Sequence, residues 1–205
     1  MKKGRKFDQV LNGALNVFLA NGFEGASVDD IAREAKVSKA TLYSYFENKA
    51  DLFTQVAARE IHRFTEAAVA SIDANMPAPV VLQHIGRHYI QFWSSDLGLG
   101  LYRICIAEAR RFPEIGRRFF EQGLMPSHTL LCEYLALAEN NGELAIAEDE
   151  RSLAAFQFSE LCRSGVVNKR LFFVQSRFSK AELDKIVKSA VKMFLARYQT
   201  GLQPS

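Results

Sequence analysis

The chain has 205 residues, 48% of them hydrophobic, and a formal net charge of +3 at pH 7. Its length and apolar content predict a globular protein with a sizeable buried core and exclude an extensively disordered chain. No uninterrupted apolar run reaches about 18 residues, so no membrane span is expected. Residues 1–50 hold eight Lys and Arg against six Asp and Glu, so the charge balance alone is a weak indication of a nucleic-acid partner.

The cysteines and the N-terminal sequence both bear on the compartment in which the protein works. Cys105, Cys132 and Cys162 are widely spaced and odd in number, so we expect reduced interior residues rather than a disulfide framework. The first ten residues, MKKGRKFDQV, meet acidic and polar side chains before any long apolar run, which argues against a secretory signal. These features predict a cytoplasmic protein.

Apolar residues recur at helical spacing along nearly the whole chain, while period-two alternation is absent. The expected fold is therefore all-α, with about nine to ten helices. The first helix is predicted from Phe7 to Phe18, with a stop at Asn21 and Gly22, where glycine can adopt a left-handed conformation. Phe23 is expected to fold back under that helix end.

Serine caps are predicted to start the second and third helices. Ser27, followed by Asp30, resembles a capping box, and Ser38 can cap a third helix over residues 39–46. A tight break at Lys36 separates the two helices. Three short helices of this kind, with the second and third joined by a few residues, are typical of helix-turn-helix DNA-binding proteins.

A long fourth helix, capped by Asn48, is predicted over residues 49–74 and would span roughly 39 Å at about 1.5 Å per residue. It is long enough to leave the first module and enter a second one. The sequence MPAP at 76–79 then breaks the helical pattern. Further helices are expected over residues 80–95, 99–111, 114–122, 127–140, 150–170 and 180–198.

The third helix carries the side chains best suited to read DNA. Leu42 and Phe46 lie four residues apart and are expected to face the core. The other side chains then project outward or lie at the edge of the helix, where they offer hydrogen-bonding groups, a methyl group and close approach to DNA. These are Lys39, Ala40, Thr41, Tyr43, Ser44 and Tyr45.

The run GFEGASVDDIAREAKVSKATLYSYFENKADLF resembles the DNA-binding module of the TetR family of bacterial regulators. With the first helix, the match covers about residues 6–55. The resemblance implies a helix-turn-helix DNA-binding domain over residues 1–50 and a helical effector-binding and dimerisation domain over residues 51–205. It also implies a function, that of a repressor that binds a palindromic operator in double-stranded DNA as a homodimer and is released by a small-molecule effector.

The resemblance further implies a set of DNA contacts, position by position. Those near backbone phosphates are Ser27, Ser38, Tyr43, Tyr45 and Lys49, and those facing base edges are Lys39, Ala40, Thr41 and Ser44. The basic N-terminal arm, formed by Lys2, Lys3, Arg5 and Lys6, is either a solvated tail or a source of further phosphate or minor-groove contacts.

Two positions depart from the family pattern, each where glycine is common. Lys36 stands in the turn, where a left-handed lysine would cost about 1 kcal/mol, and its charge could add a phosphate contact. Ala40 stands early in the third helix and could touch a thymine methyl group. Neither departure undermines the fold, but both leave the operator sequence open.

Beyond about residue 55 the resemblance extends to general architecture only. By that analogy, a four-helix dimer interface would include Phe156, Leu161, Val187, Val191 and Phe194, and the alternative is that these residues belong to the chain's own core. A pocket for a small hydrophobic or amphipathic effector would draw on His88, Tyr89, Trp93, Tyr102, Arg103 and Cys105. The alternative there is an ordinary core with satisfied polar groups and no pocket.

Enzyme and interaction-module functions are weaker alternatives. His84 and His88 are four residues apart, but Ile85 stands where the zinc-protease pattern needs glutamate, and no nearby pair completes a metal site. Cys105 lacks an evident histidine partner, and no glycine-rich phosphate loop of a common type is present. We therefore expect no enzyme activity, no metal and no cofactor. A helical module that has lost DNA binding is disfavoured because the predicted DNA-contacting residues are intact.

Overall fold

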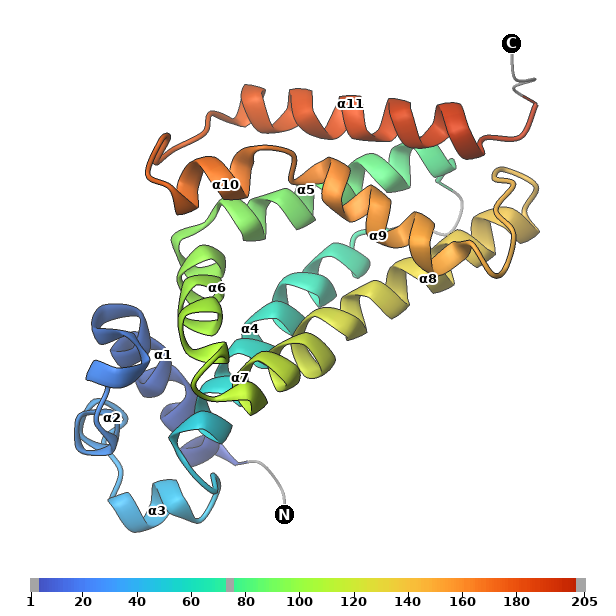
Figure 1. The fold of residues 1–205 in the computed structure, drawn as a ribbon. Coiled ribbons are helices and arrows are strands. Elements are labelled where there is room, and N and C mark those ends of the chain that lie inside the picture. The colour runs from blue at the N-terminus through green and yellow to red at the C-terminus, as the bar shows by residue number, and fades with distance from the viewer. Residues whose placement is uncertain (1–3, 73–75, 202–205) are drawn as a thin grey trace. The chain divides into compact units, whose positions relative to one another are not determined.

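The computed structural model describes residues 4–72 and 76–201, and within these ranges the chain is all-α, with no β-strand (Figure 1). α7, the π-helix η1 and α8 form one continuous run, so the described residues make ten helical segments, in agreement with the sequence. The elements are α1 (Arg5–Gly25), α2 (Val28–Glu34), α3 (Lys39–Tyr43), α4 (Lys49–Val69), α5 (Ala78–Ser94), α6 (Asp96–Ala109), α7 (Pro113–Arg118), η1 (Phe119–Leu124), α8 (Met125–Asn140), α9 (Arg151–Cys162), α10 (Val166–Leu171) and α11 (Lys180–Tyr198).

The chain forms two compact units, and each is built from two separate stretches of sequence. The first unit contains Met1–Ile61 and Gly100–Leu124, and the second contains His62–Leu99 and Met125–Ser205. Both α4 and α6 therefore contribute residues to both units. The predicted domain boundary after residue 50 falls inside α4, and it stays a prediction.

In the first unit, α1 is interrupted at the position where the sequence predicted a stop. Its buried face includes Val10, Leu11 and Phe18. At Gly22 the backbone φ is +71°, which interrupts the helix. Phe23 is buried, and its ring centroid lies 6.0 Å from that of Phe18. The stop at Gly22 and the return of Phe23 under the helix end are thus confirmed.

The helices α1 and α2 approach so closely that their backbones nearly touch. A Cβ atom on Gly13 would lie 2.7 Å from the backbone nitrogen of Ala35, which is closer than side-chain carbons approach backbone atoms in proteins. Ile31 and Ala32 on α2 are buried, as their helical spacing predicted. A short turn then joins α2 to the next helix, α3.

The fourth helix ends earlier than predicted. α4 stops at Val69, whereas the sequence pattern extended it to residue 74, and residues 73–75 lie outside the described part of the chain. Ser71 supplies the physical reason, because its Oγ donates hydrogen bonds to the carbonyl oxygens of Ala67 at 3.1 Å and Ala68 at 3.0 Å. Side-chain donors of this kind take the place of the next helical N–H groups.

The second unit buries its core between α5, α8, α9 and α11. A Cβ atom on Gly86 of α5 would lie 2.8 Å from Cγ1 of Val187 on α11 and 3.0 Å from Sγ of Cys162 on α9. Three helices therefore meet at one glycine. The predicted helix over residues 150–170 is divided into α9 and α10, because Gly165 between them adopts a left-handed φ of +72°.

The three cysteines are free thiols, with Cys105 and Cys162 buried as expected and Cys132 partly buried. Burial raises the pKa of Cys105 to about 11 and that of Cys162 to about 12, so both stay protonated at neutral pH. Within residues 4–72 and 76–201, no helix combines the length and apolarity that a membrane crossing requires.

Candidate nucleic-acid interface

The turn between α2 and α3 has the tight geometry that the sequence predicted. Lys36 adopts a φ of +54°, the left-handed conformation that glycine adopts without steric cost. The N–H of Lys36 donates to the carbonyl of Arg33 at 3.1 Å, and the N–H of Val37 donates to that of Ala32 at 3.0 Å. These bonds satisfy the last carbonyls of α2 and turn the chain into α3.

Both predicted serine caps are present. The Oγ of Ser27 accepts a hydrogen bond from the N–H of Asp30 at 3.0 Å, and it donates to Oδ2 of Asp30 at 2.5 Å. The Oγ of Ser38 accepts from the N–H of Thr41 at 3.1 Å. Each hydroxyl therefore satisfies an N–H group in the first turn of its helix, which fixes where α2 and α3 begin.

Two buried side chains hold α3 against the first unit. Leu42 and Phe46 are each about 1% exposed, and the Phe46 ring stacks on that of Phe7 with centroids 5.3 Å apart. The predicted inward face is therefore confirmed. The structure leaves Lys39, Ala40, Tyr43 and Ser44 exposed and Thr41 and Tyr45 partly exposed, and Tyr43 has 53% of its surface accessible.

The polar groups of α3 have partners within the chain. Lys39 Nζ lies 2.6 Å from Oδ1 of Asp29, and the hydrogen bond to Asp29, together with that carboxylate's charge, raises the pKa of Lys39. Ser44 Oγ donates to the carbonyl of Thr41 at 2.6 Å, and the Oγ atoms of Thr41 and Ser38 lie 2.9 Å apart. Any contact of these groups with bases therefore exchanges an existing hydrogen bond for a new one.

Tyr45 and Lys49 are more engaged with the protein than the sequence suggested. The Tyr45 ring packs edge-on against Phe7, with centroids 5.6 Å apart. Lys49 Nζ donates a hydrogen bond to the carbonyl of Ala26 at 3.0 Å and lies 4.6 Å from the ring centroid of Phe23. An ammonium group has three donors, so Lys49 keeps donors for a phosphate while it also holds the segment before α2.

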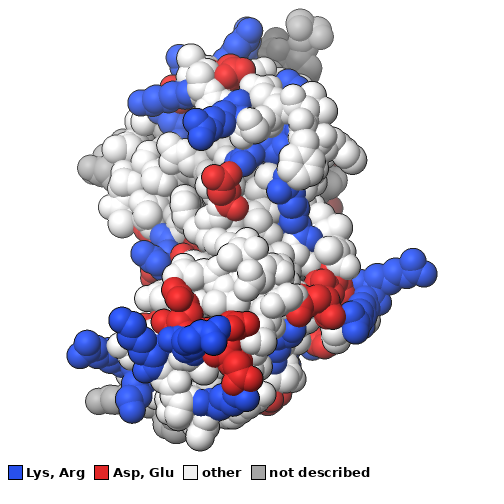
Figure 2. All heavy atoms as spheres, turned by 90° about the vertical axis from the view of Figure 1, so that its left-hand side faces the viewer, with Lys and Arg blue, Asp and Glu red and all other residues white. Residues whose placement is uncertain are grey.

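The basic N-terminal arm is described only in part. Lys2 and Lys3 lie outside the described residues. Arg5 and Lys6 are exposed, but they form the first turn of α1 rather than an extended arm. Figure 2 shows Lys and Arg side chains interspersed with Asp and Glu on the face that it presents. The ion pair between Lys39 on α3 and Asp29 on α2 also joins charges of opposite sign.

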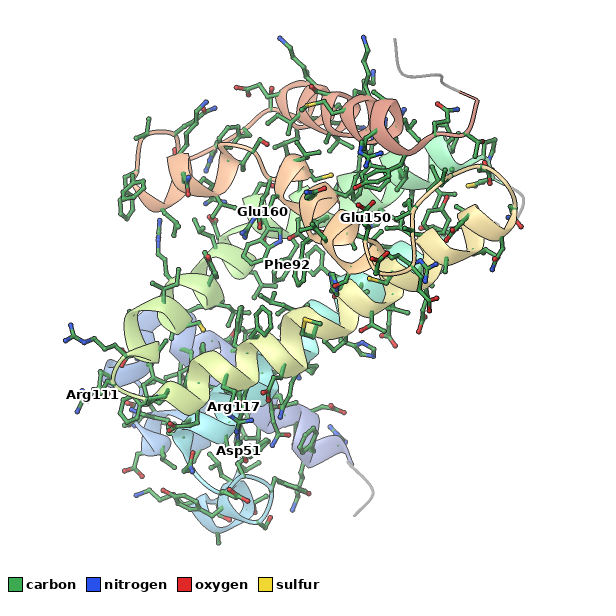
Figure 3. The ribbon with its side chains drawn as sticks, turned by 45° about the vertical axis from the view of Figure 1, so that its right-hand side comes forward. Asp51, Phe92, Arg111, Arg117, Glu150 and Glu160 are labelled. Carbon is green, nitrogen blue, oxygen red and sulfur yellow. The ribbon has the colours of Figure 1, made fainter. Side chains whose placement is uncertain are left out.

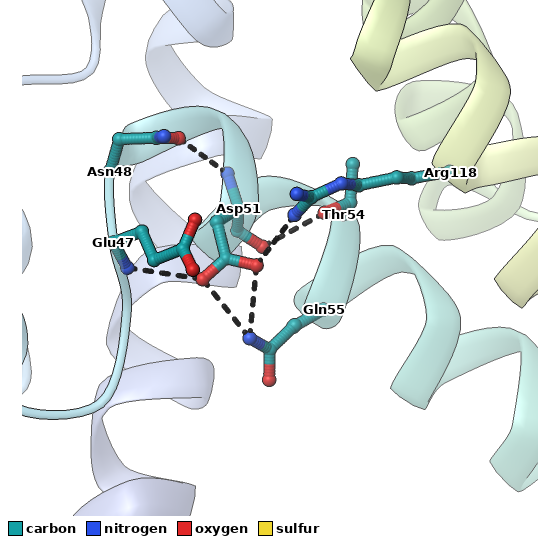
Figure 4. Close-up of polar contacts among 6 residues, drawn as sticks. All are labelled: Glu47, Asn48, Asp51, Thr54, Gln55 and Arg118. Atoms are coloured by element: carbon teal, nitrogen blue, oxygen red, sulfur yellow. Dashed lines mark hydrogen bonds and ion pairs between the residues drawn. The ribbon is translucent and has the colours of Figure 1, made fainter.

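A buried carboxylate in the first turn of α4 has a distant partner that the sequence did not reveal. Asp51, 8% exposed, accepts hydrogen bonds from the N–H of Glu47 at 3.1 Å, from Gln55 Nε2 at 3.1 and 3.2 Å, and from Arg118 Nη1 at 2.9 Å (Figure 4). Asn48 Oδ1 in turn accepts from the N–H of Asp51 at 2.8 Å, which confirms the predicted cap. The spacing of Asn48 and Asp51 is a local signal, but no sequence pattern points to Arg118, which is 67 residues away.

The residues predicted to bind an effector are divided between the two units. His88, Tyr89 and Trp93 lie on α5 in the second unit, and Tyr102, Arg103 and Cys105 lie on α6 in the first. Within the second unit, the Tyr89 and Trp93 rings meet edge to face at 6.1 Å, and burial raises the pKa of Tyr89 to about 12. The assignment of these six residues to an effector stays a prediction.

A surface groove of about 360 Å³ in the second unit is lined by other residues. It lies between α5 and α11 and does not include any of the six predicted effector residues. Its lining consists of Pro79, Gln83, Lys188, Val191, Lys192, Leu195, Ala196 and Gln199.

The predicted dimer residues also divide into two groups. Val187, Val191 and Phe194 are between 0% and 3% exposed and lie in the core of the second unit. They belong to a core shared with α5 and α9 of their own chain, which corresponds to the intrachain alternative, and their assignment to a dimer interface stays a prediction. Phe156 is exposed and Leu161 is partly exposed, so these two remain candidates for a dimer contact.

Comparison with known protein families agrees with this architecture. Residues 10–56 match the family described as bacterial regulatory proteins, tetR family, and residues 80–200 match the C-terminal domain of AefR-like transcriptional repressors. The chain belongs to the TetR family. Members of the TetR family are transcriptional regulators that combine a DNA-binding helix-turn-helix module with a ligand-binding domain.

Solved structures of TetR-family proteins share the fold over the whole chain. A TetR-family regulator of Mesorhizobium loti is 27% identical, with a TM-score of 0.87 over 98% of this chain and 100% of that one. The flavonoid-responsive regulator FrrA is also 27% identical, with a TM-score of 0.75 over 97% and 99% of the two chains. The all-α TetR architecture is therefore established for this protein.

Curated relatives in the TetR family align over shorter segments. The fatty acid metabolism regulator protein of Bacillus subtilis is 28% identical over 102 residues, which are 49% of this chain and 53% of the relative. The B. subtilis regulator YdeS is 44% identical over 54 residues, 24% of this chain and 27% of the relative. The chain thus spans between about a quarter and about half of the length of these relatives.

Proposed function

We propose that this protein is a repressor that binds a palindromic operator as a homodimer and releases it when a small hydrophobic or amphipathic effector binds. The observation that carries the proposal is the geometry of α3. This helix is fixed by Leu42 and Phe46 on one side and exposes Lys39, Ala40 and Tyr43 on the other. A short helix presented in this way fits the major groove of B-DNA.

The exposed side chains suggest a division of roles at the operator. Tyr43 would contact a backbone phosphate, and Ser27, Ser38, Tyr45 and Lys49 are proposed to add further phosphate contacts. The side chains proposed to face base edges are Lys39, Ala40, Thr41 and Ser44. Phosphate contacts supply affinity for any sequence, whereas the base-facing contacts determine which sequence is preferred.

The ion pair between Lys39 and Asp29 supports a specificity role for Lys39. On DNA that is not the operator, Lys39 would lose its ion pair with Asp29, whose Oδ1 lies 2.6 Å away, without gaining a base that accepts two hydrogen bonds, such as guanine. The freed Asp29 carboxylate would also stand close to the negatively charged backbone. Acidic residues beside a recognition helix therefore weaken random DNA binding more than operator binding.

A dimer contact is proposed on the outer faces of α9 and α11. Leu153 on α9 and Met193 on α11 are 58% and 57% exposed, and Phe156 and Leu161 also lie on α9. Two such helix pairs related by a twofold axis would form a four-helix contact. The twofold axis would place two copies of α3 in successive major grooves, about 34–36 Å apart.

The names of relatives support the class of effector. FrrA is described as flavonoid-responsive, and the B. subtilis relative is a regulator of fatty acid metabolism. Flavonoids are aromatic and fatty acids are amphipathic, which fits the aromatic and polar character of His88, Tyr89 and Trp93. Effector binding would lower operator affinity, and operator binding would lower effector affinity by the same factor.

Selection of randomised duplex DNA on the purified protein tests the proposal. The wild type is expected to enrich a palindrome, and a Lys39→Ala, Tyr43→Ala double variant is expected to lose it. A Lys188→Ala, Lys192→Ala variant is the matched control, because it also removes exposed groups but from α11 in the second unit. A wild type that enriches no sequence at moderate salt would contradict the proposal.

Sedimentation analysis tests the dimer separately. Leu153→Lys and Met193→Lys place charges in the proposed contact and should convert the dimer into monomers that remain folded. Phe172→Lys is the control, because Phe172 is 76% exposed but lies after α10, outside the two faces. Unchanged sedimentation of both α9 and α11 variants would require another dimer surface.

A further inference from the structure

We propose that Arg118 is a positioning residue for operator recognition, which acts through Asp51 on the turn that follows the recognition helix. This inference rests on the proposed function, and it adds a residue of α7 to those that determine DNA affinity. Arg118 itself is not assigned a contact with DNA.

Asp51 joins two parts of the first unit through one carboxylate. Its Oδ2 accepts from the backbone N–H of Glu47 at 3.1 Å, and its Oδ1 accepts from Arg118 Nη1 at 2.9 Å (Figure 4). Gln55 Nε2 reaches both oxygens, at 3.1 and 3.2 Å. A movement of the Arg118 side chain therefore displaces an acceptor that is bonded to the Glu47 backbone.

The Glu47 backbone is where the recognition helix is fixed to α4. Glu47 directly follows Phe46, the buried residue that holds α3 to the core, and it precedes Asn48, the cap of α4. The position of this amide sets the orientation of α3 on the core, because Glu47 is the single residue between the buried Phe46 and the capping Asn48. A shift here is transmitted to Ser44, a residue proposed to face base edges, three positions earlier in the chain.

The buried Asp51 carboxylate needs the charge of Arg118, because the residues that contact it locally do not neutralise it. Asn48 and Gln55 are neutral, and the Asp51 side chain is only 11% exposed. A buried carboxylate without a cation either draws in water or rearranges, and both disturb the groups bonded to it. The Arg118 guanidinium supplies the charge from a distant part of the sequence.

The segment that carries Arg118 is held firmly on the first unit. The ring centroids of Phe112 and Phe23 lie 5.3 Å apart, and Arg111 Nη1 lies 2.8 Å from Oε2 of Glu24. Both contacts attach the start of α7 to the C-terminal end of α1. Arg118 at the other end of α7 therefore bonds to Asp51 from a supported helix, which makes it suitable to fix a position rather than only to add charge.

Arg117 provides a matched control in the same helix. It pairs with Glu121 at 2.7 Å, four residues away, and both side chains are at least half exposed. Figure 3 labels Arg117 on this helix. Its ion pair lies within the run of α7 and η1 and does not involve residues 1–61. An Arg117→Ala variant therefore removes the same charge as Arg118→Ala and leaves the Asp51 contact intact.

The test measures binding of the full-length protein to its selected operator and to a scrambled duplex, over a range of salt concentrations. Arg118→Ala is expected to raise the operator Kd about tenfold, with a much smaller change for scrambled DNA. The salt dependence should stay unchanged, because no phosphate contact is lost. Arg118→Lys should restore most of the affinity, because one donor suffices for Oδ1, and Arg117→Ala should behave as the wild type.

Hydrogen exchange without DNA gives a readout that is independent of the operator. Arg118→Ala should increase amide exchange in peptides containing Glu47 to Asp51, and Arg117→Ala should not. If Arg118→Ala does not fold at the assay temperature, Arg118→Gln takes its place, and its Kd should exceed that of Arg118→Lys.

Three results would overturn the inference. One is an operator Kd unchanged in the folded Arg118 variants. Another is an equal loss of operator and scrambled binding. The third is a salt slope lower by about one, which would identify Arg118 as a phosphate contact. A wild type that selects no operator would instead count against the proposed function, and the exchange experiment would still decide whether Arg118 fixes the turn.

Discussion

Lys49 Nζ donates a hydrogen bond to the carbonyl oxygen of Ala26 at 3.0 Å, so the side chain assigned to a phosphate also holds the residue before the Ser27 cap. The same ammonium group lies over the Phe23 ring. Lys49 thus ties the start of α4 to the start of α2. Two properties of the protein that are usually measured separately, its stability and its DNA affinity, depend on this one residue.

Lys49→Ala is therefore expected to lower both. Loss of the hydrogen bond and the ring contact should reduce the free energy of unfolding by about 1 kcal/mol. Affinity should fall for operator and random DNA alike, with a salt slope lower by about one. Urea denaturation and salt titrations measure the two effects, with Lys192→Ala in the second unit as the control. Wild-type stability in Lys49→Ala would contradict the role assigned to the Ala26 contact.

Lys36→Gly is expected to stabilise the protein. Lys36 has a φ of +54°, and relief of the left-handed conformation, about 1 kcal/mol or more, outweighs the entropy of about 0.5–1 kcal/mol that glycine adds to the unfolded chain. Phe173→Gly is a matched control, because Phe173 in the second unit has a φ of +58°. Both variants should raise the midpoint of thermal unfolding.

Only Lys36→Gly should change the salt dependence of DNA binding, and identical salt slopes would exclude a phosphate contact by Lys36.

Gly13→Ala should destabilise the first unit. The added Cβ would meet the backbone nitrogen of Ala35 at 2.7 Å, and backbone atoms cannot rotate away as a side chain can. Overpacking of this kind costs about 1–3 kcal/mol. Gly25→Ala is the control, because the nearest atom to its added Cβ is Cβ of Asn21 at 3.4 Å, an ordinary contact. Equal denaturation midpoints for the two variants would mean that α1 and α2 can separate without cost.

Stability should decrease between neutral and mildly acidic pH. Burial, and then the charge of His84, lower the pKa of His88 below the ordinary value of 6.5, and burial also lowers the pKa of His128. Below pH 6.5 the unfolded chain takes up these protons before the folded protein does, so the free energy of unfolding falls until the pH passes the folded pKa values. His88→Gln should flatten this dependence in urea titrations between pH 7.5 and 5.

The control for that titration is His62→Gln. His62 is exposed and pairs with Glu66 at 3.1 Å, so it lacks the burial that acts on His88. An unchanged pH profile in His88→Gln would show that other groups determine the acid response.

Features set by neighbouring residues were predictable from the sequence. The caps at Ser27 and Ser38, the stop at Gly22 and the left-handed Lys36 each depend on contacts within a few residues, and the structure has all four. The residue types alone carry this information, because capping and left-handed backbone favour a small set of side chains.

Features set by distant residues were not predictable. The contact between Asp51 and Arg118 depends on how α7 lies in the first unit, and a single sequence holds no signal for it. The burial of Val187 and Phe194 in their own chain has the same origin, because an apolar stripe looks alike in a core and in a dimer contact. The effector residues remain predictions, since their assignment needs a ligand rather than a fold.

The division of the first unit into two stretches of sequence has a consequence for biosynthesis. Because Gly100–Leu124 completes this unit, the ribosome must make the chain as far as residue 118 before Asp51 can meet Arg118, and as far as residue 124 before the unit is complete. Domains that are continuous in sequence can fold as soon as they emerge, but this one has to wait for about a third of the second unit to be synthesised. Premature termination after α4 would therefore release a fragment that contains the whole recognition helix but lacks the cation for the Asp51 carboxylate.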